Sequence, residues 1–219
     1  MRTKTGLTLL LLLFSLAASA EDKPPETDWR LEKKEDGIEV YTRAVEGAKH
    51  RAVKATMVVE AGPAALVALV RDTSACAKWA AFCKSSSEHE VLSETEMYVY
   101  TLNDMPWPVK DRDALSHVFW TLDADTGTVV MRATAVTGVM KEKKGTLRLT
   151  DAVTSWTFIP EPDERTTVIS EAHVNPGGPI PAWITNRLLV DAPFETLSQM
   201  RKLISSGRYD DAAFDFMRQ

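Results

Sequence analysis

The sequence has few of the residues that usually carry metal or nucleophilic chemistry. It contains two cysteines and four histidines, and the histidines are scattered at positions 50, 89, 117 and 173. None of the four lies at metal-ligand spacing from a cysteine or from another histidine. A G-x-S-x-G element and a phosphate-binding glycine loop are also missing. We therefore find no catalytic motif and expect no metal, no cofactor and no enzymatic activity.

The chain also lacks the basic runs that bind nucleic acids. Its 26 lysines and arginines are outnumbered by 31 aspartates and glutamates, which gives a net charge of −5. The densest basic cluster, KEKK at 141–144, is interpreted as the tip of a hairpin. An acidic chain of this kind is a poor partner for nucleic acid or for a strongly anionic surface. The composition therefore argues against a nucleic-acid-binding protein.

Long apolar runs are missing except at residues 7–17, which are almost wholly apolar. Arg2 and Lys4 precede this run, and the small-residue motif ASA follows it at 18–20. This layout is typical of a secretory signal peptide, and the run is short for a membrane span. We predict a signal peptide at 1–20 and export, into the bacterial periplasm; an uncleaved anchor is the alternative. Loss of the two basic residues would bring the net charge from −5 to −7.

The two cysteines, Cys76 and Cys83, are candidates for a disulfide because an exported protein meets an oxidising compartment. Seven residues of continuous α-helix would separate them by about 10 Å, which is too far for a disulfide. A disulfide therefore requires the helix to break within CAKWAAFC. Two free buried thiols are the alternative.

The first half of the mature sequence alternates between strand and helix patterns. Polar residues 21–28 are expected to form a flexible tail. Strands are predicted at 29–35 and 37–45, joined by an Asp36-Gly37 hairpin turn, and at 51–60. Pro63 then begins an alanine-rich helical segment at 63–82. Residues 85–102 return to a strand pattern that is rich in β-formers.

The second half continues with strands and ends in a helix. We predict strands at 114–122 and 128–136, and a long pair formed by 146–162 and 165–174. Residues 182–204 carry apolar side chains at three- and four-residue steps, which predicts one long helix that Pro193 should kink. Residues 207–219 form a tail that could add a short helix. This order predicts an α+β fold in which a curved antiparallel sheet wraps around the late helix.

Three motifs in this order resemble the START (StAR-related lipid-transfer) domain family. They are PWPVKDRD at 106–113, SWTFIPEP at 155–162 and NPGGPIPAWITNRLLVDAPFETLSQMRKL at 175–203. DGIEVYTRAVEG at 36–47 and KWAAFCKSSSEHEVL at 78–92 fit the same family. The resemblance implies a START-like domain at 29–206 in a secreted bacterial member. It also implies the helix-grip fold, with an internal hydrophobic cavity enclosed by the sheet and the C-terminal α-helix.

The resemblance gives the PWPVKDRD motif a structural role. Pro106-Trp107-Pro108 would form the turn between two strands, and residues 111–113 would begin the next strand with an ion pair or hydrogen bonds near the end of the cavity. Some sterol-binding relatives carry an internal glutamate–arginine pair. Ungapped counting places Val99 and Val118 at those positions, which argues against a sterol-hydroxyl site of that type.

The resemblance also implies a set of residues that contact an apolar ligand, although packing against each other is the alternative for each of them. The predicted ligand-binding residues on strands are Met97, Val99, Arg112, Val118, Met131, Trp156 and Phe158, and those on the helix are Trp183, Leu188, Phe194 and Leu197.

Family members bind sterols, phospholipids, ceramides or other apolar molecules, and most of them are carriers or sensors. The expected function is therefore non-catalytic carriage of a lipid or other apolar molecule by a monomer, with transient membrane contact. The alternative is a helix-grip enzyme of the cyclase or hydratase kind, with His117 and either Asp113 or Glu171 as acid and base. A third alternative is a structural or partner-binding protein whose cavity is filled.

Overall fold

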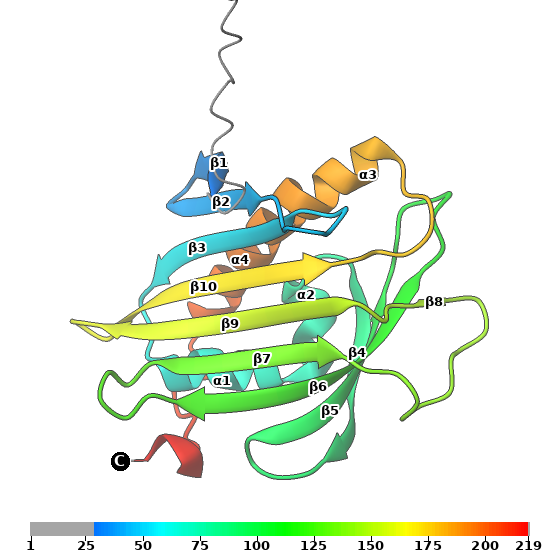
Figure 1. Ribbon diagram of the computed structural model, residues 1–219. Helices are drawn as coiled ribbons and strands as arrows, with labels where there is room; N and C mark the ends of the chain where they lie inside the picture. Colours follow the sequence, from blue (N-terminus) through cyan, green and yellow to red (C-terminus); the bar gives the residue numbers. More distant parts are fainter. Residues whose placement is uncertain (1–28, 219) are drawn as a thin grey trace, which may run out of the picture.

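The computed structural model describes residues 29–218, and one ten-stranded sheet organises this part of the chain (Figure 1). The predicted signal peptide at 1–20 and the predicted tail at 21–28 lie outside the described residues. The strands are β1 (Arg30–Glu35), β2 (Ile38–Arg43), β3 (Ala52–Val59), β4 (Cys83–Val91), β5 (Glu96–Asn103), β6 (Arg112–Leu122), β7 (Val129–Ala135), β8 (Leu147–Arg148), β9 (Ala152–Glu161) and β10 (Arg165–Val174).

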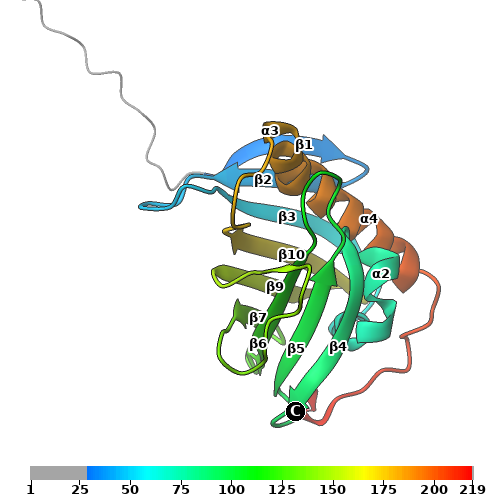
Figure 2. The same cartoon turned by 90° about the vertical axis from the view of Figure 1, so that its right-hand side faces the viewer.

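The sheet curls around the helices, as the two views in Figures 1 and 2 show. Its strand order is β1-β2-β3-β10-β9-β7-β6-β5-β4, and β8 pairs with β6 off this path. Helix α4 (Ala192–Ile204) packs against β2 and β3, and α2 (Cys76–Trp79) packs against both α4 and β4. The helices thus bridge the two ends of the strand order, which gives the predicted helix-grip fold.

The predicted turns are confirmed by the backbone. Asp36 and Gly37 have φ angles of 51° and 70°, which is the left-handed conformation that a two-residue hairpin turn requires. Asp163 and Glu164 adopt the same conformation between β9 and β10, with φ angles of 60° and 54°. These two turns fix the register of the flanking strand pairs.

The helical segment at 63–82 breaks in the way that a disulfide needs. Helix α1 (Pro63–Arg71) is followed by a 3-10 turn (Thr73–Ala75) and by α2, which ends at Trp79. Phe82 then takes a φ angle of 63°, and the chain turns back into β4. Cys76 and Cys83 form a disulfide across this turn, with their Cα atoms 5.9 Å apart. The prediction of a disulfide is therefore confirmed.

The long strand predicted at 146–162 is wrong, because the chain leaves the sheet between β8 and β9. Strands β7 and β9 are antiparallel partners, so the KEKK cluster does lie between paired strands, but in a long connecting loop and not at a tight hairpin tip. It lies in the connection at 136–146, before the short parallel pairing of β8 with β6. This connection folds over the sheet face opposite to the helices, where Lys143 Nζ lies 3.8 Å from the centre of the Tyr100 ring.

The C-terminal helix spans the predicted range but is not uniform. Helix α3 (Ala182–Asn186) and α4 are joined by a π-helical turn (Arg187–Asp191). Pro193 has no backbone N–H to give to the carbonyl of Leu189, and the N–H of Ala192 bonds to Arg187 one residue further back. The distortion expected at Pro193 is thus a widened turn before it. A 3-10 turn (Asp215–Met217) follows in the tail, and no helix within 29–218 is both long and apolar enough to cross a membrane.

One buried ion pair anchors the connection at 136–146 together with β8, a segment that we call the 136–148 connection, to the sheet. Arg148 Nη2 donates to Asp113 Oδ2 at 2.9 Å, and the two side chains are 3% and 0% exposed. Burial raises the pKa of Asp113, but the hydrogen bond and the charge of Arg148 outweigh burial and hold this pKa below the usual aspartate value. The predicted ion pair in the DRD motif is therefore present.

Removing one partner of this pair should destabilise the fold more than removing both. We expect Asp113→Leu to lower the free energy of unfolding by about 3–5 kcal/mol, since it leaves the Arg148 charge buried and unpaired. Asp113→Leu combined with Arg148→Met should cost less than that single change. Urea unfolding measures the two single variants, Asp113→Leu and Arg148→Met, and the double variant; a double variant whose loss equals the sum of the two single losses would contradict this account.

The exposed Lys84–Asp104 pair provides the control. Asp104→Leu should cost less than about 1 kcal/mol, as the loss of an exposed pair usually does.

Because the folded pKa of Asp113 is depressed, its stabilisation is complete above the ordinary aspartate pKa of about 3.9 and is lost as the pH falls below it. The wild type should therefore lose more stability in this acid range than the double variant does.

Candidate ligand-binding cavity

A cavity of about 650 Å³ lies between the concave face of the sheet and the helices. This volume is within the range of about 300–1,000 Å³ that is usual for small-molecule sites. Side chains alternate between the two faces of a strand, so every second residue of β5, β6, β7, β9 and β10 points into this space. The register of the strand pairs aligns these inward residues into rows across the sheet.

Two neighbouring rows explain why the space is open. The first row combines large residues with small ones: Trp120, Met131, Trp156, Ser170 and Ala55. The next row contains only small and medium side chains: Val118, Ala133, Thr154, Ala172 and Val53. A broad sheet face covered by alanine, threonine and valine is not filled by the helices that pack over it. The cavity is therefore a direct consequence of side-chain size along the strands.

The row on the other side of Trp156 closes the cavity. Its members are Leu122, Val129, Phe158, Val168 and Met57. Val129, Phe158 and Val168 have no exposed surface at all. The Trp156 ring also meets Trp79 edge-on, with 5.7 Å between ring centres. Close packing beyond Trp156 thus forms the floor of the cavity.

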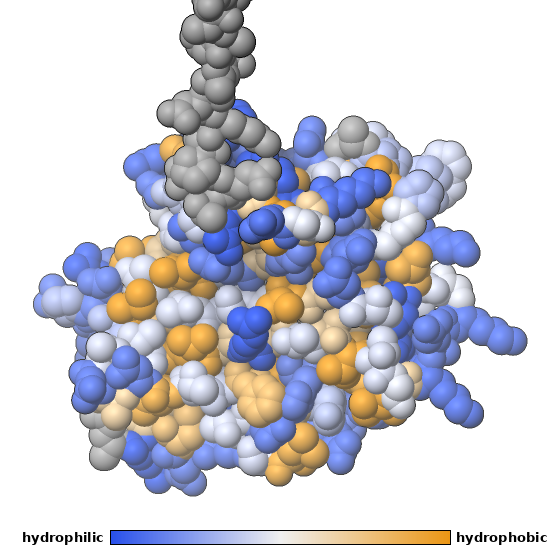
Figure 3. Space-filling model, in the orientation of Figure 1, coloured by the Kyte–Doolittle hydropathy of each residue, from blue (hydrophilic) through white to orange (hydrophobic). Residues whose placement is uncertain are grey.

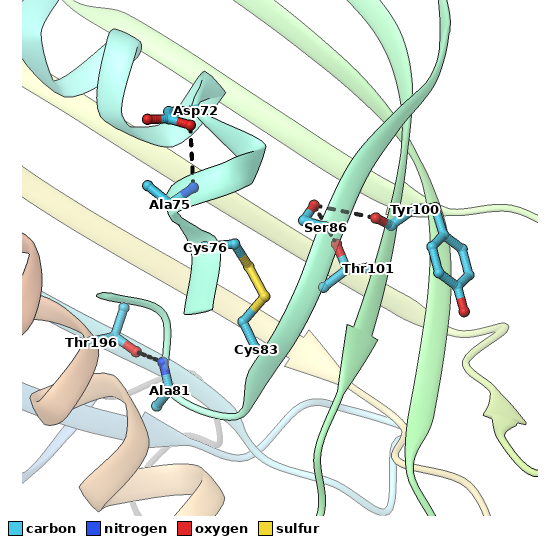
Figure 4. The surroundings of a disulfide bond; sticks show 9 residues. All are labelled: Asp72, Ala75, Cys76, Ala81, Cys83, Ser86, Tyr100, Thr101 and Thr196. Atoms are coloured by element: carbon cyan, nitrogen blue, oxygen red, sulfur yellow. Dashed lines mark hydrogen bonds between the residues drawn. A yellow bond between two sulfur atoms is a disulfide. The ribbon is translucent and has the colours of Figure 1, made fainter. Parts of the chain in front are cut away.

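The helical side of the cavity is held by the disulfide turn (Figure 4). Cys76 and Cys83 both line the cavity, and the N–H of Ala81 donates to Thr196 Oγ1 of α4 at 3.0 Å. Figure 4 shows this bond together with the disulfide, which ties α2 to the start of β4. The disulfide and the bond to α4 therefore fix the wall that faces the sheet.

Most of the predicted ligand-binding residues line this cavity. They are Met97, Val99, Arg112, Val118, Met131 and Trp156 on strands, and Leu188 and Leu197 on the C-terminal helix. Val99 and Val118 both face the interior, so these two positions are apolar parts of the wall. Contact of any of these side chains with a ligand stays a prediction.

Three predicted residues lie elsewhere, so their placement in the lining was wrong. Phe158 belongs to the packed row below the floor. Trp183 is 53% exposed on the outer side of α3. Phe194 packs partly against the core, where Lys33 Nζ lies 3.7 Å from its ring centre. Helical periodicity identified an apolar side of the helix, but part of that side meets β1 or solvent.

Sequence reasoning missed the small residues that create the space. Ala114, Ala133, Ala152 and Ala172 all line the cavity. A signal was available in β7, where Met131, Ala133 and Ala135 alternate with more polar residues. Small inward residues in a strand indicate a face that packs closely or a face that leaves room, and only the neighbouring strands decide between the two.

The acid–base candidates of the enzyme alternative do not reach the cavity. Ser116 and Val118 line it, so His117 between them points to the outer face, where it lies 2.8 Å from Glu96 and stacks on Tyr98. Glu171 lies between two lining residues in the same way, and Asp113 is paired with Arg148 under the 136–148 connection. Figure 3 shows this outer face, where hydrophobic and hydrophilic residues are interspersed.

One end of the cavity is formed by loops, and we call it the loop end. It comprises the segments 44–51, 104–111 and 175–181; the second and third lie on the right in Figure 1. Arg112 is 4% exposed here and donates to the carbonyl oxygens of Pro176 (3.2 Å), Gly177 (3.0 Å) and Lys110. Burial lowers the pKa of this guanidinium. Arg112 thus ties β6 to the loop before α3.

Two exposed tryptophans flank the loop end. Trp107 is 88% exposed in the loop between β5 and β6, and Trp183 is 53% exposed on α3. The two tryptophans belong to neighbouring segments, because Pro106, next to Trp107, and Arg187, one helical turn after Trp183, line the same small surface hollow. Trp183 and Arg187 are four residues apart on a helix, so they share one side of it. The loop end therefore carries apolar side chains on its outer surface.

Comparison with known proteins agrees with this geometry. The family model of the START domain matches residues 17–206. An uncharacterised protein from Pseudomonas aeruginosa is 36% identical over 176 residues, which cover 80% of this chain and 85% of that protein. The chain therefore belongs to the START domain family.

Solved structures agree with the fold. The STAR-related lipid transfer protein from Xanthomonas axonopodis, solved as a fragment, superposes with a TM-score of 0.74 at 33% identity, over 81% of this chain and 98% of that one. Human StAR-related lipid transfer protein 5 gives a TM-score of 0.73 at 15% identity, over 82% of this chain and 87% of that one. At this lower identity the likeness concerns the fold alone.

The same substitution should affect stability very differently at two buried alanines. Ala133→Phe should change the free energy of unfolding by less than about 1 kcal/mol, because the ring enters open space. Ala75→Phe should cost about 3 kcal/mol or more, because Ala75 is 1% exposed and packs in the core outside the cavity lining, to which Ala133 belongs. Urea unfolding of the two variants tests this, and equal losses would mean that the cavity is not open space.

Proposed function

We propose that this protein binds a lipid or another apolar molecule in the cavity and carries it without chemical change. The cavity, enclosed by the sheet and the helices and lined mainly by apolar side chains, is the observation that carries the proposal. Transfer of apolar surface from water gains about 25 cal/mol per Å², so such a cavity can bind without many polar contacts. The name of the similar Xanthomonas protein, a lipid transfer protein, supports the same function.

The proposed site of action is the bacterial periplasm, with the chain acting as a monomer. The signal-peptide pattern at 1–20 supports export, and the Cys76–Cys83 disulfide fits an oxidising compartment. An apolar ligand needs a shielded path across an aqueous compartment, and a protein with an internal cavity provides one.

The proposed route of the ligand is through the loop end, with a membrane on the other side. Trp107 and Trp183 would enter the interface of the membrane, where tryptophan is favoured because its ring is amphipathic. Contact would be transient, since these are two side chains without a membrane-spanning helix among residues 29–218.

Filling the cavity should weaken binding strongly without unfolding the protein. We expect Ala133→Phe to weaken binding of a pyrene-labelled lipid by at least about tenfold, because the new ring occupies the space of the ligand. Energy transfer from the lining tryptophans to pyrene measures the affinity. Thr134→Phe is the matched control, since this neighbour is exposed on the outer face. Equal affinities of the two variants would contradict binding in this cavity.

Removing the exposed tryptophans should slow transfer but leave affinity unchanged. Trp107→Ala and Trp183→Ala should each lower the rate of lipid transfer between phosphatidylcholine vesicles by about tenfold, through lost interfacial contact. Phe119→Ala is the control, because Phe119 is 41% exposed but lies on the outer face of the sheet. A control variant that slows transfer as much as the tryptophan variants would contradict docking through the loop end.

A further inference from the structure

We propose that the ligand is an amphiphile with an anionic headgroup, a carboxylate or a phosphate, which binds at Arg112 and Asn103 while its apolar chain extends toward Trp156. This inference rests on the proposed function and adds the chemical class and the orientation of the ligand. It is carried by the charged groups of the cavity wall, most of which lie at the loop end.

Arg112 is a buried cation without a carboxylate partner. It is only 4% exposed, and its three nitrogen atoms each donate to a backbone carbonyl. A guanidinium has five N–H donors, so two remain available. No ion pair joins Arg112 to any carboxylate in the described part of the chain, whereas Arg148 has Asp113. A buried unpaired charge is costly, so an anion at this place would be stabilised.

Asn103 adds a second polar group at the same place. It is the direct register partner of Arg112 across β5 and β6, and both residues line the cavity. Its side-chain amide has no hydrogen-bond partner among residues 29–218, although an amide has two donors and an acceptor. The two side chains therefore offer adjacent unused donors in a wall that is otherwise mostly apolar.

The remaining charges on the cavity wall favour an anion as well. Lys49, His50 and Arg51 line the loop end next to β10, where His173 Nε2 lies 3.1 Å from the carbonyl oxygen of His50. Arg71 and Asp72 line the cavity at the end of α1, and both are already bonded: Arg71 donates to the carbonyl oxygen of Glu94 (2.9 Å), and Asp72, the carboxylate among the described lining residues, accepts from Arg208 (3.0 Å) and Tyr209 (2.9 Å). The lining thus carries excess positive charge in a chain of net charge −5.

The direction of the apolar chain follows from the rows. Along β6 the lining residues after Arg112 are Ala114, Ser116, Val118 and Trp120. Eight residues of strand separate Arg112 from Trp120, which corresponds to roughly 27 Å. A headgroup at the loop end would therefore leave a long path between small side chains for one extended chain, down to the floor.

The first test compares headgroups on one chain length in the wild-type protein. Tryptophan fluorescence is titrated with hexadecanoate, with 1-palmitoyl lysophosphatidic acid, and with the neutral partners hexadecan-1-ol and monopalmitoyl glycerol. The anionic ligands should bind at least about tenfold more tightly than the neutral ones. The tighter of the two anions identifies the source of the headgroup. Equal affinity of charged and neutral ligands overturns this inference alone, and no binding of any of them overturns the proposed function too.

The second test locates the headgroup. Arg112→Gln and Asn103→Leu should each weaken hexadecanoate binding by about tenfold and change hexadecan-1-ol binding by less than about twofold. Arg132→Gln is the matched control, since it removes the same charge from the outer face of β7. Arg112 also holds the loop at 176–177, so Arg112→Gln could fail to fold; in that case the Asn103→Leu result alone tests the headgroup site. A preference for hexadecanoate that survives in the folded variants overturns the site.

Discussion

The concave face of the sheet changes from large to small side chains along its strands, and the cavity depends on this change. Phe158 and its register partners pack solidly against α1 and form the floor. A few residues further along the strands, the small side chains of Ala133 and Ala172 do not fill the space between the sheet and the C-terminal helix. The disulfide between Cys76 and Cys83 then fixes the opposite wall, so the space is held open from both sides.

Arg112 and Arg148 show how burial and pairing give similar side chains different roles. Arg148 is neutralised by Asp113 on the outer face, where it pins the 136–148 connection. Arg112 is nearby in the same strand pairing, yet it faces the cavity and has only carbonyl partners. Strand alternation alone separates these environments, because Arg112 and Asp113 are consecutive residues. One motif thus supplies both an anchor for the fold and an unpaired charge in the cavity.

Local signals in the sequence predicted local structure well. The Asp36-Gly37 hairpin, the break between Cys76 and Cys83 and the distortion before Pro193 each follow from the conformational limits of a few residues. Placement in the lining was harder for residues such as Trp183. Whether an apolar residue meets a cavity, a neighbouring strand or solvent depends on distant elements, and one helical period cannot distinguish them. The strand predicted at 146–162 failed for the same reason, since a long-range ion pair holds its first residues elsewhere.

Native mass spectrometry of the mature protein purified from its own host, followed by organic extraction, tests the central claim most directly. We expect one apolar molecule per chain in the wild type, and a much lower occupancy in Ala133→Phe purified in parallel. A wild-type protein that carries nothing and also takes up no member of a broad lipid panel would contradict the claim that this cavity is a lipid-carrying site.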